Sequence, residues 1–238
     1  MKNKHNAIGF VALSLIFSLL LSLFCLLGAS FSRVKEKSVI GKQNYTVVLD
    51  AGHGGEDGGA SSTSGLLEKE LNLAIATDIG AYLELCGISV VYTRTEDILL
   101  YDRNENYQGR KKILDLAARL KIAREYENAV FVSIHMNAFP QKQYKGLQVY
   151  YSPNHPLSKA LASTVQENAR NCLDRENQRK IKKATSSIYL LDRLEKPAIL
   201  IECGFLSNDT EAERLASEEY QKQLALVIAQ SIAENLMQ

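Results

Sequence analysis

Hydrophobic positions near the start of the chain form one continuous block. Residues 8–28 are almost entirely apolar, and no charged residue occurs between Asn6 and Ser32. At about 1.5 Å per residue this block spans roughly the 30 Å hydrocarbon core of a bilayer, whereas a cleavable signal usually has only about 7 to 15 apolar residues. We therefore predict an uncleaved signal anchor, a transmembrane segment over residues 1–33, followed by a polar linker over residues 34–44.

From residue 45 onward, short apolar runs alternate with segments of helical periodicity. Leu71, Ile75, Ile79 and Leu83 follow helical spacing, and Gly87 stands where that helix should end. About 200 residues suit one domain with a proper core. Strands are expected at 45–49, 89–93, 129–134, 147–151, 188–191 and 198–201, and helices at 70–85, 112–126, 156–173 and 220–236.

This alternation predicts an α/β fold for residues 45–238. We expect a three-layer sandwich in which a mixed, largely parallel six-stranded sheet carries helices on both faces. Three of the expected strands end directly in a polar group that is chemically reactive. One leads into Asp50 and His53, one into His135, and one into Glu202. Ligands bind beyond the carboxyl ends of strands in open α/β sheets, so these residues are expected to converge on one crevice.

Two histidines in that crevice indicate a metal site. A zinc hydrolase needs three protein ligands and an open fourth position, and two imidazoles with one carboxylate are an established set. His53 and His135 supply the imidazoles. Glu202 follows a buried run, where a carboxylate is costly unless it is paired, metal-bound or exposed in a cleft. Spacing alone leaves the third ligand open among four carboxylates: Glu56, Asp57, Glu68 and Glu70.

Each part of this pattern also has a simpler explanation. A histidine in a glycine-rich turn is often a turn residue, and one that ends a strand often satisfies only backbone groups. A phosphate-binding loop over residues 52–59 is disfavoured, because the glycine spacing is wrong and Glu56 and Asp57 would repel phosphate. Nucleophilic catalysis by Cys203 lacks a second orienting group. The metal site is therefore the preferred interpretation.

Charge and cysteine content exclude some other classes of protein. The formal net charge is +1 with both signs spread along the chain, so no nucleic-acid partner is expected. Cys86, Cys172 and Cys203 form no C-x-x-C pair, and we expect all three to be buried free thiols. The basic run that begins at Arg179 is typical of a solvated face; alternatively, it meets acidic peptide carboxylates or a wall polymer. The run comprises Arg179, Lys180, Lys182 and Lys183.

Five ordered motifs carry a resemblance that covers residue 45 to the C-terminus. They are DAGHGG at 50–55, EKELN at 68–72, TR at 93–94, SIHMNA at 133–138 and ECGFLSN at 202–208. Through them the chain resembles the zinc-dependent N-acetylmuramoyl-L-alanine amidases called amidase type 3. Ala51 stands where that family usually has proline, which affects the stiffness of the turn rather than ligation.

The resemblance implies an enzyme that hydrolyses the amide between N-acetylmuramic acid and L-alanine in bacterial peptidoglycan. It implies one Zn²⁺ ion with His53, Glu68 and His135 as ligands, and Glu202 as the catalytic acid and base. Asn137, two residues after the second histidine, is expected to bind substrate or to orient that histidine.

One subgroup of the family, the sporulation and germination amidases, is similar through residues 101–112 and 187–190. That similarity implies action in spore cortex, on the way to muramic δ-lactam. The catalytic domain is then expected outside the cytoplasm, at the cell membrane or secreted, or in the intermembrane space of the forespore. An activating partner protein is a further expectation.

The sequence is also compatible with two other functions. One is a membrane-tethered, non-catalytic protein that binds the wall or acts as a scaffold. The other is a zinc peptidase that cuts within the stem peptide.

Overall fold

The computed structural model describes residues 45–102, 104, 107 and 109–237. The predicted anchor and linker, residues 1–44, lie outside the described residues. Among the helices that are described, none combines the length and apolar character needed to cross a membrane.

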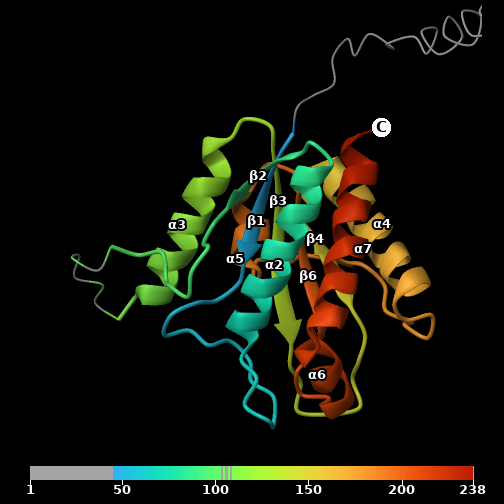
Figure 1. Ribbon diagram of the computed structural model, residues 1–238. Helices are drawn as coiled ribbons and strands as arrows, with labels where there is room; N and C mark the ends of the chain where they lie inside the picture. The colour runs from blue at the N-terminus through green and yellow to red at the C-terminus, as the bar shows by residue number, and fades with distance from the viewer. Residues whose placement is uncertain (1–44, 103, 105–106, 108, 238) are drawn as a thin grey trace, which may run out of the picture. The chain divides into compact units, whose positions relative to one another are not determined.

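A six-stranded sheet in the order β2-β1-β3-β6-β4-β5 forms the middle layer (Figure 1). Its strands are β1 (Thr46–Ala51), β2 (Ser89–Tyr92), β3 (Ala129–Asn137), β4 (Gln148–Tyr151), β5 (Lys182–Lys183) and β6 (Ala198–Phe205). The neighbours from β2 to β6 are parallel, whereas β4 pairs with β6 in the antiparallel sense. The predicted mixed, largely parallel sheet is confirmed.

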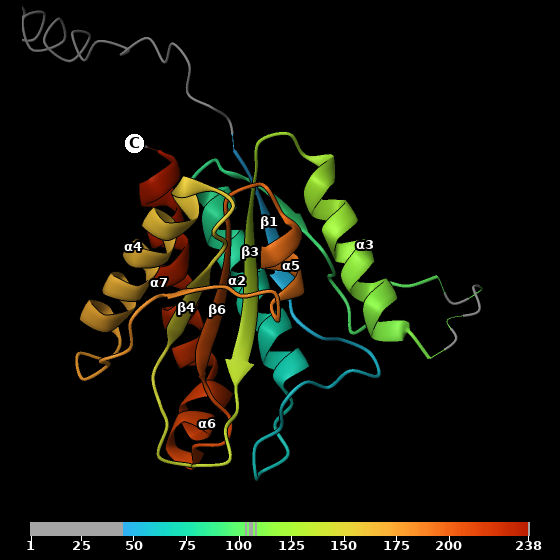
Figure 2. The same ribbon diagram turned by 180° about the vertical axis from the view of Figure 1, so that it is seen from behind.

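Alternation of side chains along the strands assigns each face of the sheet to its own helices. Val47, Leu49 and Ile201 belong to a core with α2 (Glu68–Leu85), α4 (Pro156–Cys172) and α7 (Glu218–Leu236). Val48 and Leu200 belong to a smaller core with α3 (Lys111–Glu125) and α5 (Tyr189–Arg193). Figure 2 shows α3 and α5 on the face opposite α2, α4 and α7, so the expected three layers are confirmed.

One predicted strand is wrong. Residues 188–191 contribute to helix α5 (Tyr189–Arg193), which buries Leu190 and Leu191 against the sheet. A short apolar run does not distinguish a buried helix from a strand. The sixth strand is instead β5, two exposed lysines paired with β4 at the sheet edge, where charged residues are common and no apolar pattern exists.

The cysteines and one short helix also differ from expectation. Cys203 is buried as predicted, but Cys86 and Cys172 are exposed free thiols, because they lie at helix ends that leave the core. Helix α6 (Asp209–Ala216) was not predicted; it begins after Asn208, whose side chain accepts a hydrogen bond from Glu211 N.

Candidate active site

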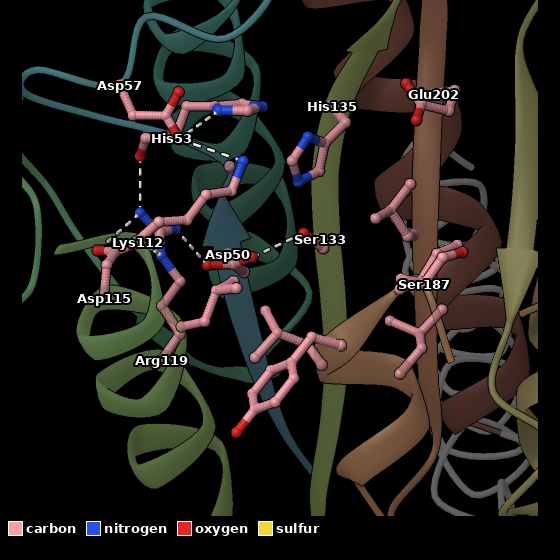
Figure 3. Close-up of a pocket in the computed structure, with 17 residues that line it drawn as sticks. Asp50, His53, Asp57, Lys112, Asp115, Arg119, Ser133, His135, Ser187 and Glu202 are labelled. Atoms are coloured by element: carbon pink, nitrogen blue, oxygen red, sulfur yellow. Dashed lines mark hydrogen bonds and ion pairs between the residues drawn. The ribbon is translucent and has the colours of Figure 1, made fainter. Parts of the chain in front are cut away.

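The polar residues that end β1, β3 and β6 meet at one edge of the sheet (Figure 3). His135 and Glu202 are partners in the register of β3 and β6, and β1 runs beside β3 up to Ala51, two residues before His53. These strands are parallel, so their carboxyl ends share one edge. The predicted convergence of residues that lie far apart in the sequence is confirmed.

The turn after β1 presents His53 in an unusual backbone conformation. His53 has a φ of 61°, in the left-handed region that non-glycine residues rarely adopt. Two arginines hold the carbonyl groups of this turn. Arg119 donates to Ala51 O at 2.8 Å and to His53 O at 2.7 Å, and Arg94 donates to Ala51 O at 2.9 Å and to Gly52 O at 3.0 Å. The strained turn is therefore fixed by charge-assisted hydrogen bonds from both sides.

Buried carboxylates hold Arg119 in place. Asp50 Oδ1 lies 2.7 Å from Arg119 Nη1, and Asp115, one helical turn before Arg119 on α3, lies 2.7 Å from its Nε. Burial favours a higher pKa for Asp50, but Arg119 together with hydrogen bonds from Ser133 and Thr93 outweighs it and holds that pKa below its ordinary value. This ion pair keeps its charge deep in the sheet because both partners are hydrogen-bonded.

Three side chains at the edge converge closely enough to hold one metal ion: His53, Glu68 and His135. His53 Nε2 lies 3.2 Å from Glu68 Oε1, and His135 Nδ1 lies 2.9 Å from the same oxygen. Glu68 is the first residue of α2, where a negative charge is stabilised by the helix dipole. Burial opposes ionisation of Glu68, but the hydrogen bonds from both histidines hold its pKa well below the ordinary value.

Glu68 is thus the carboxylate, among the four that spacing left open, that reaches both histidines. Asp57 Oδ2 lies 2.9 Å from the other nitrogen of His53, Nδ1, behind the cluster. Glu56 forms an exposed ion pair with Lys111, and Glu70 is exposed on α2. Sequence reasoning considered Asp57 only as a ligand; its spacing of four residues from His53 was the available signal of a supporting role.

Glu202 faces this cluster from β6. Its Oε2 is buried and has no hydrogen-bond partner among the described residues. Burial raises the pKa of Glu202 above its ordinary value, and the nearby carboxylate of Glu68 adds to that shift, while His135 opposes it. A buried carboxylate with a free oxygen is suited to take up and return a proton.

A cavity of about 250 Å³ opens on the α3 and α5 face beside these residues (Figure 3). Lys112 and Ser187 line it in addition to the site residues, and Leu116, Leu191 and Leu200 form part of its apolar wall. This wall was not predicted from the sequence, because residues 188–191 of α5 were expected to form a strand.

Two other predicted residues take distinct positions. Asn137 lies two residues beyond His135, and its side chain lines a second hollow rather than the 250 Å³ cavity. Cys203 is buried on the opposite face of β6 from Glu202, and burial raises the pKa of its thiol well above the ordinary value. A thiol that stays protonated and buried is a poor nucleophile, so the cysteine mechanism is excluded.

Comparison with known proteins gives one consistent family. The family model described as N-acetylmuramoyl-L-alanine amidase matches residues 47–234. The germination-specific N-acetylmuramoyl-L-alanine amidase of Bacillus subtilis is 37% identical over 186 residues, which cover 78% of this chain and 77% of that protein.

Solved structures agree. The CwlD amidase from Clostridioides difficile, in complex with the GerS lipoprotein, has a TM-score of 0.76 at 38% identity and covers 81% of this chain and 98% of that one. The amidase AmiC2 of Nostoc punctiforme has a TM-score of 0.68 at 36% identity, covering 83% of this chain and 99% of that one.

Proposed function

Since this chain belongs to the N-acetylmuramoyl-L-alanine amidase family, we propose that it hydrolyses its cell-wall amide with one zinc ion held by His53, Glu68 and His135. The convergence of these three side chains is the observation that carries the proposal. The histidine nitrogens lie 3.2 and 2.9 Å from Glu68 Oε1, close to the separation of about 3.3 Å that tetrahedral zinc bonds of about 2.05 Å require, and all three ligand atoms lie within 4.8 Å of one another. Two imidazoles with one carboxylate also match a known catalytic donor set.

When bound by these residues, zinc would act as a Lewis acid that polarises the scissile carbonyl and lowers the pKa of a water molecule. Glu202 acts as the proton carrier: Oε2 accepts a proton from the attacking water and returns it to the amine of L-alanine as the amide bond breaks. Its raised pKa suits both halves of that task, because the protonated form is accessible in the buried site.

Asp57 orients the first ligand. Its carboxylate lies 2.9 Å from His53 Nδ1, which favours the tautomer whose Nε2 is free to bind metal. Asn137 contributes to substrate binding from the end of β3, since the amide of its side chain has no hydrogen-bond partner in the described part of the chain.

The relatives also support a proposal about the cellular setting. We infer a catalytic domain outside the cytoplasm, anchored by residues 1–33, that acts in spore cortex on the way to muramic δ-lactam. The germination-specific name of the Bacillus subtilis relative supports this role. The complex of the Clostridioides difficile amidase with a lipoprotein supports a protein partner for this chain as well.

The first test measures zinc content and digestion of purified peptidoglycan on the same samples of the full chain. Wild type should hold about one zinc ion and release peptides with free L-alanine amino termini, as detected by mass spectrometry. Glu202→Gln should keep the metal and lose activity, because it retains the shape of the side chain but carries no proton. His135→Ala should lose both, because it removes a ligand.

The same samples separate the competing functions. A zinc-loaded protein that leaves peptidoglycan uncut, even with a candidate partner, supports the scaffold. Cleavage that leaves L-alanine attached to muramic acid supports the peptidase. The presence of all three ligands and Glu202 favours the amidase, because a scaffold has no need to retain them.

A further inference from the structure

A second hollow, of about 280 Å³, lies next to Glu202 on the same face of the sheet. Gln148 on β4, which lines the hollow, is the register partner of Glu202 on β6. Neighbouring strands are about 4.8 Å apart, so the floor of the hollow begins one strand away from the proton carrier. Its other lining residues include Asn137, Tyr150, Arg179, Lys182 and Phe205.

Arg179 is fixed at the edge of this hollow. Its Nε donates to Lys145 O at 2.7 Å and its Nη1 to Gln148 Oε1 at 2.9 Å, and the guanidinium lies 4.4 Å from the centroid of the Phe205 ring. Its Nη2 has no hydrogen-bond partner among the residues described. Arg179 is half-buried and held in place by these contacts, with the N–H groups of Nη2 left over, unlike a residue on a solvated face.

The rest of the hollow also lacks negative charge. Lys182 Nζ lies 5.7 Å from the ring of Tyr150 and pairs with no carboxylate in the described residues. No aspartate or glutamate lines the hollow. Burial raises the pKa of Glu202 on the neighbouring strand, and Arg179 opposes that shift. Two cations without a counter-charge thus lie beside the catalytic edge.

We propose that this hollow binds the peptide side of the substrate, with Arg179 and Lys182 holding a carboxylate of that peptide. The inference rests on the proposed amidase function. The carboxyl group of muramic acid is consumed in the scissile amide and the acetylated sugars are neutral, so the anionic groups of a muramoyl peptide are peptide carboxylates. An arginine with a free donor is a strong partner for such a group.

The distance from Glu202 to Arg179 indicates which residue of the peptide carries the bound carboxylate. Gln148 and Glu202 project from neighbouring strands about 4.8 Å apart, and Gln148 Oε1 lies 2.9 Å from Arg179 Nη1, so the guanidinium lies roughly 8 Å from Glu202. An extended peptide covers at most about 3.6 Å per residue, so about two residues bridge this distance. The carboxylate is therefore assigned to the residue that follows L-alanine, and the free amide of Asn137 is placed to contact the peptide between them.

The test compares two muramoyl peptides that differ only in that residue, one with a free carboxylate and one with a carboxamide. The zinc-loaded full chain should cleave the carboxylate form with a kcat/KM roughly 10- to 100-fold higher, the range expected for a hydrogen bond to a charged group. Arg179→Gln should remove this preference by lowering kcat/KM on the carboxylate form alone. Lys182→Gln should reduce it by about three- to tenfold, with a change in KM rather than kcat.

Matched controls keep the test decisive. Lys183→Gln removes the same charge from the next residue of β5, whose side chain points to the other face, and should leave the preference intact. Arg179→Gln also removes hydrogen bonds to the chain, so Lys182→Gln, at an exposed residue without hydrogen bonds in the described part, tests the charge without that loss.

Equal cleavage of both peptides by wild type, with no selective effect of either variant, overturns the subsite while leaving the amidase intact. Failure of zinc-loaded wild type to cleave either peptide overturns the proposed function instead.

Discussion

The two histidines of the site reach the same point by different structural routes. His135 lies on strand β3, between β1 and β6, and pairs with Glu202 just before an irregularity in the register, so backbone pairing within the sheet positions it. His53 lies beyond the end of β1 in a left-handed turn, and its backbone is held by Arg119 while Arg94 holds the carbonyls just before it. A central strand positions a ligand through its ladder, whereas a turn requires added interactions to hold a strained conformation.

Those added interactions are buried charges. Asp50 and Arg119 are both almost fully buried, and removing two such charges from water is costly unless the pair is fully hydrogen-bonded. Here both partners are hydrogen-bonded. Ser133 and Thr93 donate to Asp50, and Arg119 also donates to the carbonyl groups of the turn and to Asp115. The β1 side should therefore be the side more sensitive to single substitutions.

The largest loss of stability is expected from Arg119→Met. This change leaves Asp50 and Asp115 buried without their cation and frees the His53 turn, so the free energy of unfolding should fall by about 3–5 kcal/mol. Urea denaturation measures it. Lys121→Met, at an exposed residue of the same helix, should stay within about 0.5 kcal/mol of wild type. A loss below about 1 kcal/mol for Arg119→Met would show that the turn holds without its arginine.

Gly52→Ala is expected to lower stability less than Arg119→Met does, but to weaken the affinity for zinc clearly. A Cβ at this position would lie 2.2 Å from His135 Cε1, so the imidazole would have to move. We expect a loss of about 1–3 kcal/mol and at least a roughly tenfold weaker affinity for zinc.

Gly58→Ala is the matched control, because the nearest atom to its new Cβ is Leu67 Cδ2 at 3.8 Å. Zinc titration of both variants, beside their unfolding curves, checks the prediction. Undiminished zinc affinity in Gly52→Ala would mean that His135 has room to move within its strand-held position.

The smallest loss of stability is expected from Ser133→Ala, which removes a hydrogen bond of 2.6 Å to Asp50. Because the pKa of Asp50 is lowered in the folded protein, its ionised form stabilises the fold above the unfolded pKa of about 3.9, and that stability is lost as the pH falls toward the folded value. The variant should be about 1 kcal/mol less stable than wild type at pH 7, and this difference in the free energy of unfolding, the gap to wild type, should narrow below about pH 4.

Ser231→Ala is the control for that pH dependence. Ser231 is buried on α7 and donates to Val227 O at 2.7 Å, a neutral acceptor, so its gap to wild type should stay constant over the same pH range. Unfolding free energies at several pH values measure both variants. A constant gap for Ser133→Ala would mean that its hydroxyl does not stabilise the charge on Asp50.

Most elements of the fold could be predicted from the local pattern of apolar residues. The continuous apolar runs of β1 and β3 and the four-residue repeat of α2 were assigned correctly without any tertiary information. The run at residues 188–191 was mistaken for a strand, and the real edge strand at Lys182 went unnoticed. Both are short segments whose conformation depends on what they pack against rather than on their own pattern.

For the site, the chain itself determined which chemical groups follow the strands: His53, His135 and Glu202 stand at strand ends in the linear pattern. Tertiary structure decided which carboxylate joins them, because spacing does not distinguish Glu56, Asp57, Glu68 and Glu70. Only the start of α2 directs one of them to both histidines. It also decided that Arg119 holds the turn and that Arg179 borders the second hollow. Periodicity encodes burial and element type, whereas such contacts depend on how separate elements pack against one another.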